Sequence, residues 1–150
     1  MTRQRGFTLI EILAVIAIVI VLTTISFAAF SAFRNKSVLN EARAAVLSEL
    51  NLARSQTLAS EDRVSWGVHF EVDHIIRFRG SSFSPSDPNN RVILMPSGIQ
   101  IGLISLGGPS EIIFERLTGR SGATGFIRLE RTADQNASTT INIYASGIAE

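Results

Sequence analysis

The chain of 150 residues contains no cysteine and two histidines, His69 and His74. Without cysteine it forms no disulfide, so its folded part must be held together by its own core and by packing against neighbours. Two histidines without cysteine do not make a zinc site, and Glu71 or Asp73 would have to contribute to one. We therefore expect both histidines to be sheet-edge residues, and we predict no metal and no cofactor.

Charged residues are scarce in one long segment: Glu11 is the only one among the 27 residues 7–33. The segment also contains no proline and no glycine, so nothing in it interrupts a helix. A helix of this length spans roughly 40 Å at about 1.5 Å per residue, enough to cross a bilayer core of about 30 Å with some tilt. A carboxylate at the depth of Glu11 is costly in a membrane, so we expect it to have a partner.

The balance of charge argues against nucleic acid as a partner. Arg3 and Arg5 precede the apolar segment and Glu11 lies inside it, so the 14 basic and 13 acidic residues of the chain leave 12 of each beyond residue 33. A neutral domain has no general electrostatic attraction for nucleic acid or acidic polymers. Because basic residues stay in the cytoplasm, Arg3 and Arg5 predict a single pass with the N-terminus inside and the C-terminal domain outside.

The string R-G-F-T-L-I-E at residues 5–11 resembles the processing site of type IV prepilins and of the pseudopilins of type II secretion. The resemblance implies that prepilin peptidase cuts between Gly6 and Phe7 and methylates Phe7. Glu11 is then the fifth residue of the mature chain, and it neutralises the N-terminal amine of a neighbouring subunit during assembly. This amine would be the partner that the apolar surroundings of Glu11 require.

The same resemblance implies partners and a location. The partners are prepilin peptidase, other pilins or pseudopilins in a filament, an inner-membrane assembly platform, and the lipid bilayer before assembly. The chain would lie first in the cytoplasmic membrane and then in a periplasmic or extracellular filament. Two other interpretations are weaker. A cleaved secretory signal has a shorter apolar core, although Ala28, Ala29 and Ala32 offer small residues, and a plain signal anchor has no need of Glu11.

Residues 36–60 continue the helix with a period of 3.6 and one apolar face. That face is formed by Val38, Leu39, Ala42, Ala45, Val46, Leu50, Leu52 and Ala53. Glu49 falls inside this apolar arc, at an edge position or in contact with a neighbour. With nothing to separate the two halves, the sequence predicts one helix over about residues 7–59, whose second half carries a sheet.

Beyond residue 62 the period changes to two, which predicts short antiparallel strands with one buried and one solvent-exposed face. The expected strands are residues 64–72, 74–79, 91–95, 99–106, 111–117, 126–131 and 139–145, with polar connections at 80–90, 118–125 and 132–138. The fold class is α+β, a pilin-like long N-terminal helix packed on an antiparallel β-sheet domain. The expected divisions are a leader (1–6), a transmembrane and assembly half of the helix (7–33), an amphipathic half (34–60) and an extracytoplasmic β-rich domain (61–150).

Three further segments resemble the GspH/FimT-type family of minor pilins and pseudopilins. They are L-A-R-S at the helix end within residues 52–68, the run F-E-R-L-T-G in residues 114–129, and Y-A-S-G at residues 144–147. DNA-binding members carry an arginine-bearing tail after that glycine, whereas this chain ends in Gly-Ile-Ala-Glu, so we do not expect DNA binding.

The resulting hypothesis is a structural filament subunit, a minor pilin or pseudopilin, and not an enzyme, since no catalytic constellation or G-x-S-x-G motif occurs. The alternative is a tip binding module of a competence or adhesion pilus, whose loops 80–90 and 118–125 contact DNA, a surface or a secreted substrate.

Overall fold

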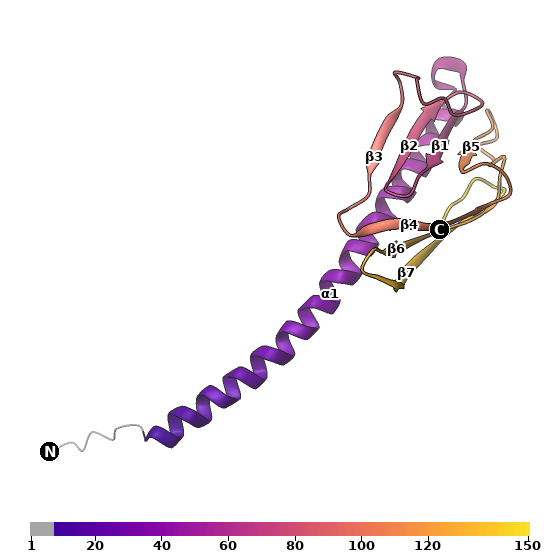
Figure 1. Ribbon diagram of the computed structural model, residues 1–150. Helices are drawn as coiled ribbons and strands as arrows, with labels where there is room; N and C mark the ends of the chain where they lie inside the picture. Colours follow the sequence, from indigo (N-terminus) through magenta and orange to yellow (C-terminus); the bar gives the residue numbers. More distant parts are fainter. Residues whose placement is uncertain (1–7) are drawn as a thin grey trace. The chain divides into compact units, whose positions relative to one another are not determined.

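The computed structural model describes residues 8–150 (Figure 1). Helix α1 (Leu9–Leu58) comes first and is followed by a 3-10 turn, η1 (Glu61–Arg63), and by strands. The strands are β1 (Trp66–Phe70), β2 (His74–Arg79), β3 (Arg91–Leu94), β4 (Ile99–Leu106), β5 (Glu111–Ile113), β6 (Gly125–Arg131) and β7 (Asp134–Ile143). A long apolar N-terminal helix with antiparallel strands confirms the predicted α+β, pilin-like fold class. Two compact units divide the chain after Ser37, and α1 contributes to both.

In the first unit, α1 begins at Leu9 because Thr8 caps it. The Thr8 hydroxyl accepts a hydrogen bond from the backbone N–H of Glu11 at 3.3 Å, which satisfies a donor that the helix leaves free at its N-terminus. Among the described residues, the stretch Leu9–Phe27 is the one long and apolar enough to cross a membrane, with a mean hydropathy of 2.7 and none of it buried. Nineteen helical residues span about 28 Å, close to the thickness of a bilayer core.

Three hydroxyl side chains in this apolar stretch bond back to the helix itself. Thr23, Thr24 and Ser26 donate to the carbonyl oxygens four residues earlier, at 2.6, 2.8 and 2.9 Å. Each hydroxyl proton is therefore satisfied without a partner from outside the helix.

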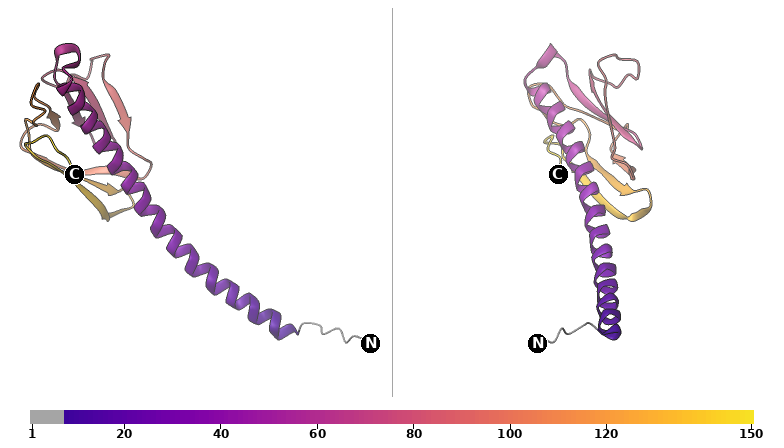
Figure 2. Two further views of the ribbon diagram at one scale, coloured as in Figure 1. Left: turned by 180° about the vertical axis from the view of Figure 1, so that it is seen from behind. Right: turned by 90° about the vertical axis from the view of Figure 1, so that its left-hand side faces the viewer.

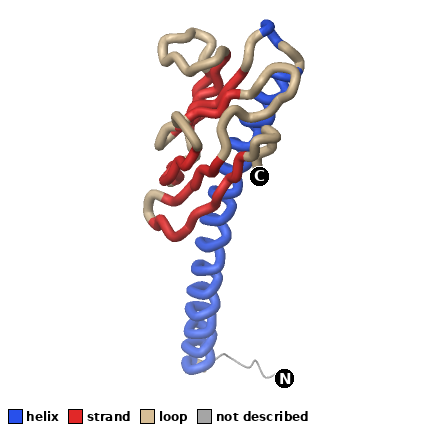
Figure 3. The backbone as a smooth tube through the Cα atoms, turned by 90° about the vertical axis from the view of Figure 1, so that its right-hand side faces the viewer, coloured by secondary structure: helices blue, strands red, loops and turns tan. Residues whose placement is uncertain are grey.

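In the second unit, α1 buries a stripe of residues spaced by three or four, namely Leu39, Ala42, Val46, Leu50 and Ala53. Both sheets lie on one side of this part of the helix (Figures 2 and 3). Leu52 was expected on the buried face, but it is 40% exposed. Two residues along a helix turn the side chain by about 200°, so Leu52 points away from the side that Leu50 buries.

The strands form two antiparallel sheets where one was expected. The first has the order β3-β2-β1-β5 and the second the order β4-β6-β7. The sheets meet where the turn after β1 approaches β4, since Ile101 donates its N–H to the carbonyl of Val72 at 2.8 Å. The predicted alternation is confirmed at the end of β7, where Ile141 and Ile143 are buried and Asn142 is exposed, but in β6 Glu130 is buried together with Ile127 and Leu129. In β1 and β2 residues on both faces are buried, so the expected solvent-exposed face is absent from these two described strands.

Three strands differ in extent from the prediction by more than one residue, and the first of them, β1, covers residues 66–70 instead of 64–72. Strand β5 ends at Ile113 instead of residue 117, because the chain turns back there and Leu117 takes a φ of 69°. Strand β7 begins at Asp134 instead of residue 139, and Arg131 pairs with Asp134 across a tight turn. The first part of β7 is polar and exposed on both faces, so its sequence carries no alternation of period two.

Glu130 on β6 lies on the side of the strand predicted to be solvated, yet it is only 4% exposed. A bulge in β4 places Gly102 against it, and any Cβ at residue 102 would overlap the Glu130 carboxylate. Gln100 donates a hydrogen bond to this carboxylate at 3.0 Å. The buried charge is thus accommodated by a glycine and held by an amide.

The charge inside the apolar arc of the helix has a partner in the first sheet. Glu49 accepts a hydrogen bond from Nη1 of Arg77 on β2 at 2.9 Å, and the two side chains are 14% and 9% exposed. The guanidinium carbon of Arg77 also lies 5.9 Å from the ring centroid of Trp66. Because both charges are largely removed from water, removal of either one would leave the other buried and unpaired, which is strongly destabilising.

We expect Glu49→Gln to lower the free energy of unfolding by about 3 kcal/mol, since it leaves Arg77 buried without a counter-charge. The double variant Glu49→Gln/Arg77→Met should be more stable than Glu49→Gln alone. Denaturant unfolding of the full chain in detergent, followed by the fluorescence of Trp66, measures both values. Glu41→Gln, at an exposed position of the same helix, is the control, and an equal effect there would contradict the prediction.

Candidate functional site

The residues singled out by the N-terminal motif are only partly placed. Gly6 and Phe7, the predicted cleavage and methylation residues, lie outside the described residues 8–150. Glu11 lies in the first turn of α1 and is exposed, and its neighbours on the helix surface are Ile12, Val15 and Ile16. Within residues 8–150, none of the ion pairs includes Glu11. The structure therefore shows a carboxylate on an apolar helix surface, and its role in assembly remains a prediction.

A second arrangement joins the three segments quoted above at residues 52–68, 114–129 and 144–147. Arg54 does not belong to the apolar face predicted for the helix, yet it is half-buried and donates from Nε to the carbonyl of Gly119 at 3.0 Å. Its Nη2 lies 3.5 Å from the carbonyl of Ser146. The backbone of Gly147 has a φ of +77°, and a Cβ there would collide with the carbonyl oxygen of Gly119. Three segments distant in sequence thus meet around one guanidinium and two glycines.

The C-terminal tail folds back onto β7. Glu150 and Asn142 exchange two backbone hydrogen bonds of 2.7 and 3.0 Å, and the Tyr144 hydroxyl donates to the Glu150 carboxylate at 2.9 Å. This hydrogen bond to Glu150 raises the pKa of Tyr144. The tail is therefore part of the sheet, and it presents an acidic side chain where a DNA-binding tail would present a cation.

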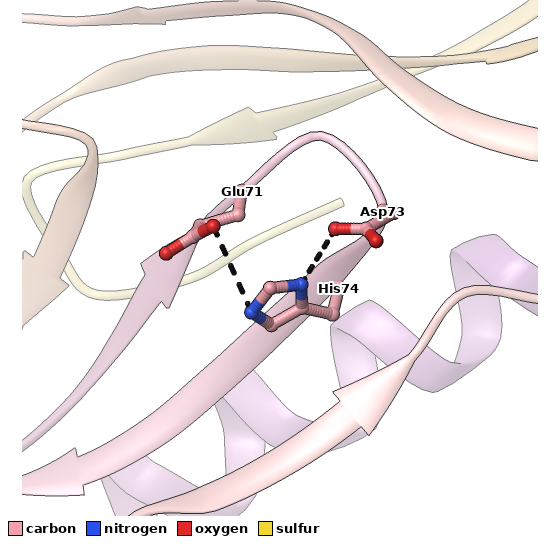
Figure 4. A group of neighbouring side chains, drawn as sticks. All are labelled: Glu71, Asp73 and His74. Carbon is pink, nitrogen blue, oxygen red and sulfur yellow. Dashed lines mark hydrogen bonds and ion pairs between the residues drawn. The ribbon is translucent and has the colours of Figure 1, made fainter. Parts of the chain in front are cut away.

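A third arrangement collects titratable side chains at the turn between β1 and β2 (Figure 4). His74 lies between two carboxylates: its Nδ1 is 2.6 Å from Asp73 Oδ1 and its Nε2 is 3.8 Å from Glu71 Oε2. Ligand atoms of Glu71, Asp73 and His74 all lie within 4.8 Å of one another, which marks them as potential metal ligands. The hydrogen bond from His74 lowers the pKa of Asp73.

His69 lies close to the same turn. Its Nε2 is 3.8 Å from Glu71 Oε1, its Nδ1 is 3.7 Å from Glu111 Oε2, and its ring stacks on Phe83 with centroids 4.1 Å apart. The expectation of sheet-edge histidines is wrong, because β1 and β2 are the two inner strands of the first sheet. Glu71 directly follows β1 and lies on the same face of the hairpin as His69, and its backbone N–H donates to the carbonyl of His74 across the turn. The hairpin itself therefore brings both rings to Glu71.

Some of these residues could have been found from sequence. The spacing His-x-Glu on a strand, followed by a two-residue turn and a second histidine, is enough to place three side chains on one face of a hairpin. Thr8-x-x-Glu11 likewise has the spacing of a helix cap. No local sequence pattern indicates the partners of Glu49 and Arg54, because those partners are distant in sequence and depend on which segments pack against the helix.

Comparison with known proteins gives one finding at the N-terminus. Residues 1–27 match the family model described as the prokaryotic N-terminal methylation motif. No curated protein and no solved structure matches the chain.

The packing of Gly147 against Gly119 makes a prediction for stability. Gly147→Ala should lower the free energy of unfolding by about 2 kcal/mol more than Gly98→Ala, because both alanines are strained at positive φ but only the first overpacks its surroundings. Gly98 is the matched control, with a φ of +81° and no described atom within 4 Å of an added Cβ. Equal losses in the unfolding assay followed by Trp66 fluorescence would show that this junction is not tightly packed.

Proposed function

From the methylation motif at residues 1–27, which supports a type IV pilin-like protein processed by prepilin peptidase, we propose a more specific function. The chain is a structural, non-catalytic subunit, a minor pilin or pseudopilin of the GspH/FimT type, in a type IV pilus or a type II secretion filament. The motif match is the observation that carries the proposal. Gly6 supplies the cleavage position and Phe7 the methylated N-terminus.

The apolar stretch Leu9–Phe27 gives this subunit two successive environments. None of the stretch is buried within the chain, and its length suits a bilayer core. In the proposed life cycle it lies in the cytoplasmic membrane, with the N-terminus in the cytoplasm, and then packs among the same helices of other subunits in a filament. Lipid tails and apolar side chains are similarly apolar, so this transfer is nearly neutral and is decided by a few specific interactions.

Glu11 provides such an interaction. It stands on an apolar helix surface, and within residues 8–150 it has no charged partner. We propose that the methylated amine of Phe7 on a neighbouring subunit pairs with it in the filament. In low dielectric, removal of either charge leaves the other buried and unpaired.

The assignment to the GspH/FimT type is supported by the junction around Arg54. The three segments that carry this resemblance are far apart in sequence, yet they meet through Arg54, Gly119 and Gly147. A shared structural role explains why such short and separate motifs occur together in one chain. The acidic C-terminal tail, bonded into β7, supports a subunit that does not bind DNA.

Sheared and purified filaments test the proposal directly. Quantitative mass spectrometry should find this chain in trace amounts relative to another pilin, with N-methylated Phe7 as its first residue. A chain that dominates the filament would contradict the minor role and the GspH/FimT assignment. Intact residues 1–6 in the membrane fraction would contradict processing and, with it, the whole proposal.

A second experiment isolates the charge of Glu11. Glu11→Ala should be cleaved normally, but its abundance in purified filaments should fall at least tenfold, because the pairing with the amine costs several kcal/mol to lose (roughly 1.4 kcal/mol per factor of ten). Glu41→Ala removes an exposed carboxylate from the same helix and should assemble like the unaltered chain. Normal incorporation of Glu11→Ala would overturn the assigned role.

A further inference from the structure

The residues at the turn between β1 and β2 have no place in filament assembly as described above, and their arrangement is specific. One carboxylate oxygen of Glu71 lies 3.8 Å from Nε2 of His74 (Figure 4), and the other lies 3.8 Å from Nε2 of His69. Behind each ring stands a second carboxylate, Glu111 at 3.7 Å from Nδ1 of His69 and Asp73 at 2.6 Å from Nδ1 of His74.

The tautomer of His74 follows from its shortest contact. An ionised carboxylate only accepts hydrogen bonds, so the 2.6 Å separation from Asp73 places a proton on Nδ1 of His74. In the neutral ring, Nε2 then carries a lone pair, and this lone pair faces the carboxylate of Glu71. Nε2 of the neutral His74 ring and the Glu71 carboxylate are both electron-pair donors, so they repel one another unless a cation lies between them.

The separation of these two atoms suits a metal ion better than a hydrogen bond. At 3.8 Å the atoms are too far apart for a direct hydrogen bond. A zinc ion holds imidazole nitrogen and carboxylate oxygen at about 2.0–2.2 Å each, which places them roughly 3.4 Å apart at a tetrahedral angle. Side-chain movements of a few tenths of an ångström therefore bring His74 and Glu71 onto one ion.

His69 lies on the other side of Glu71, outside the group of ligand atoms that lie within 4.8 Å of one another, so it has further to move than His74. Its ring stacks on Phe83, and Glu111, the carboxylate behind it, accepts the backbone N–H of Phe83 at 3.2 Å. Its Nδ1 is a buried atom that has no hydrogen-bond partner within the described residues. Histidine ligands of metals commonly direct their second nitrogen to a carboxylate, which orients the ring and increases its basicity. His74 has that arrangement with Asp73, whereas Nδ1 of His69 lies 3.7 Å from Glu111, too far for a direct hydrogen bond.

The charges of the cluster are also unbalanced. Within residues 8–150, the ion pairs of Glu71, Asp73 and Glu111 are formed only with the two histidines. In the described part of the chain, these three carboxylates thus have no ion pair with a lysine or an arginine. A bound divalent cation would offset most of that charge.

We propose that His69, Glu71 and His74 form a binding site for a first-row divalent transition metal, with Zn²⁺ as the representative ion, and that Asp73 and Glu111 support the two imidazoles. Imidazole together with carboxylate suits zinc, whereas calcium and magnesium take oxygen ligands. The site ties β1 to β2 at their turn. It does not depend on the proposed function, because it is built within a single chain.

The test is calorimetric titration of the chelator-treated full chain in detergent with ZnCl₂ at pH 7.5. We expect saturable binding of one Zn²⁺ per chain and no binding of Ca²⁺. Glu71→Gln and His74→Ala should each lose at least tenfold in affinity, and Asp73→Asn about 10–100-fold as an outer carboxylate. Glu41→Gln should bind like the unaltered chain. At pH 5.5 the affinity should fall, because metal binding requires deprotonated ligands.

Two results would overturn the site. One is a titration of the unaltered chain without saturable binding at pH 7.5. The other is binding that Glu71→Gln and His74→Ala leave unchanged, which would show an adventitious ion elsewhere. Melting followed by Trp66 fluorescence without zinc shows whether each variant is folded, and His74→Gln replaces His74→Ala if the alanine variant is not. Imidazole ¹⁵N shifts give an independent measurement, since zinc should move the Nε2 signals of both histidines.

Discussion

Residues 38–150 depend on one surface, the buried stripe of α1 that runs from Leu39 to Ala53. No disulfide supports this part of the chain, so apolar burial against the stripe is the main force that holds two separate sheets together. Polar links then fix the register of the helix against the sheets: Glu49 bonds to β2, Arg54 to the turn after β5, and Thr57 to β1. The Thr57 hydroxyl accepts the N–H of Trp66 at 2.9 Å and donates to the carbonyl of Ala53 at 2.9 Å. Each link lies about one or two turns along the helix from the last.

Local pattern was sufficient for the elements of the fold. The helix, the number of strands and the buried apolar residues of β6 follow from periodicities of 3.6 and two, because these reflect which side of an element meets the core. Pattern failed where a residue depends on a distant partner. From sequence, Glu49 is an unexplained charge in an apolar arc, and the structure explains it by the ion pair with Arg77. From sequence, Glu130 is a solvated residue, and the structure buries it against Gly102. The division into two sheets was missed for the same reason, since the pattern within a strand does not show which other strands it pairs with.

The candidate sites divide in the same way. The N-terminal motif is contiguous, so Gly6, Phe7 and Glu11 could be named from sequence, while their roles still rest on resemblance and on the family match. The cluster around Glu71 was not predicted, because two histidines five residues apart define no geometry until the turn that joins them is known. A hairpin with a two-residue turn puts positions 69, 71 and 74 on one face, whereas a longer loop would have separated them. The decisive information was the length of one turn.

The hydroxyl groups of Thr23, Thr24 and Ser26 have a consequence for how α1 tolerates a change of surroundings. Each already donates to a carbonyl of its own helix, so none requires water, a lipid headgroup or a neighbouring side chain. The backbone hydrogen bonds of a helix are equally self-contained. The stretch Leu9–Phe27 therefore needs no hydrogen-bond partner from its surroundings for these groups, and it can move from one apolar medium to another without breaking a hydrogen bond. The exception within this stretch is the carboxylate of Glu11, whose free energy depends on whether its surroundings offer a partner for its charge.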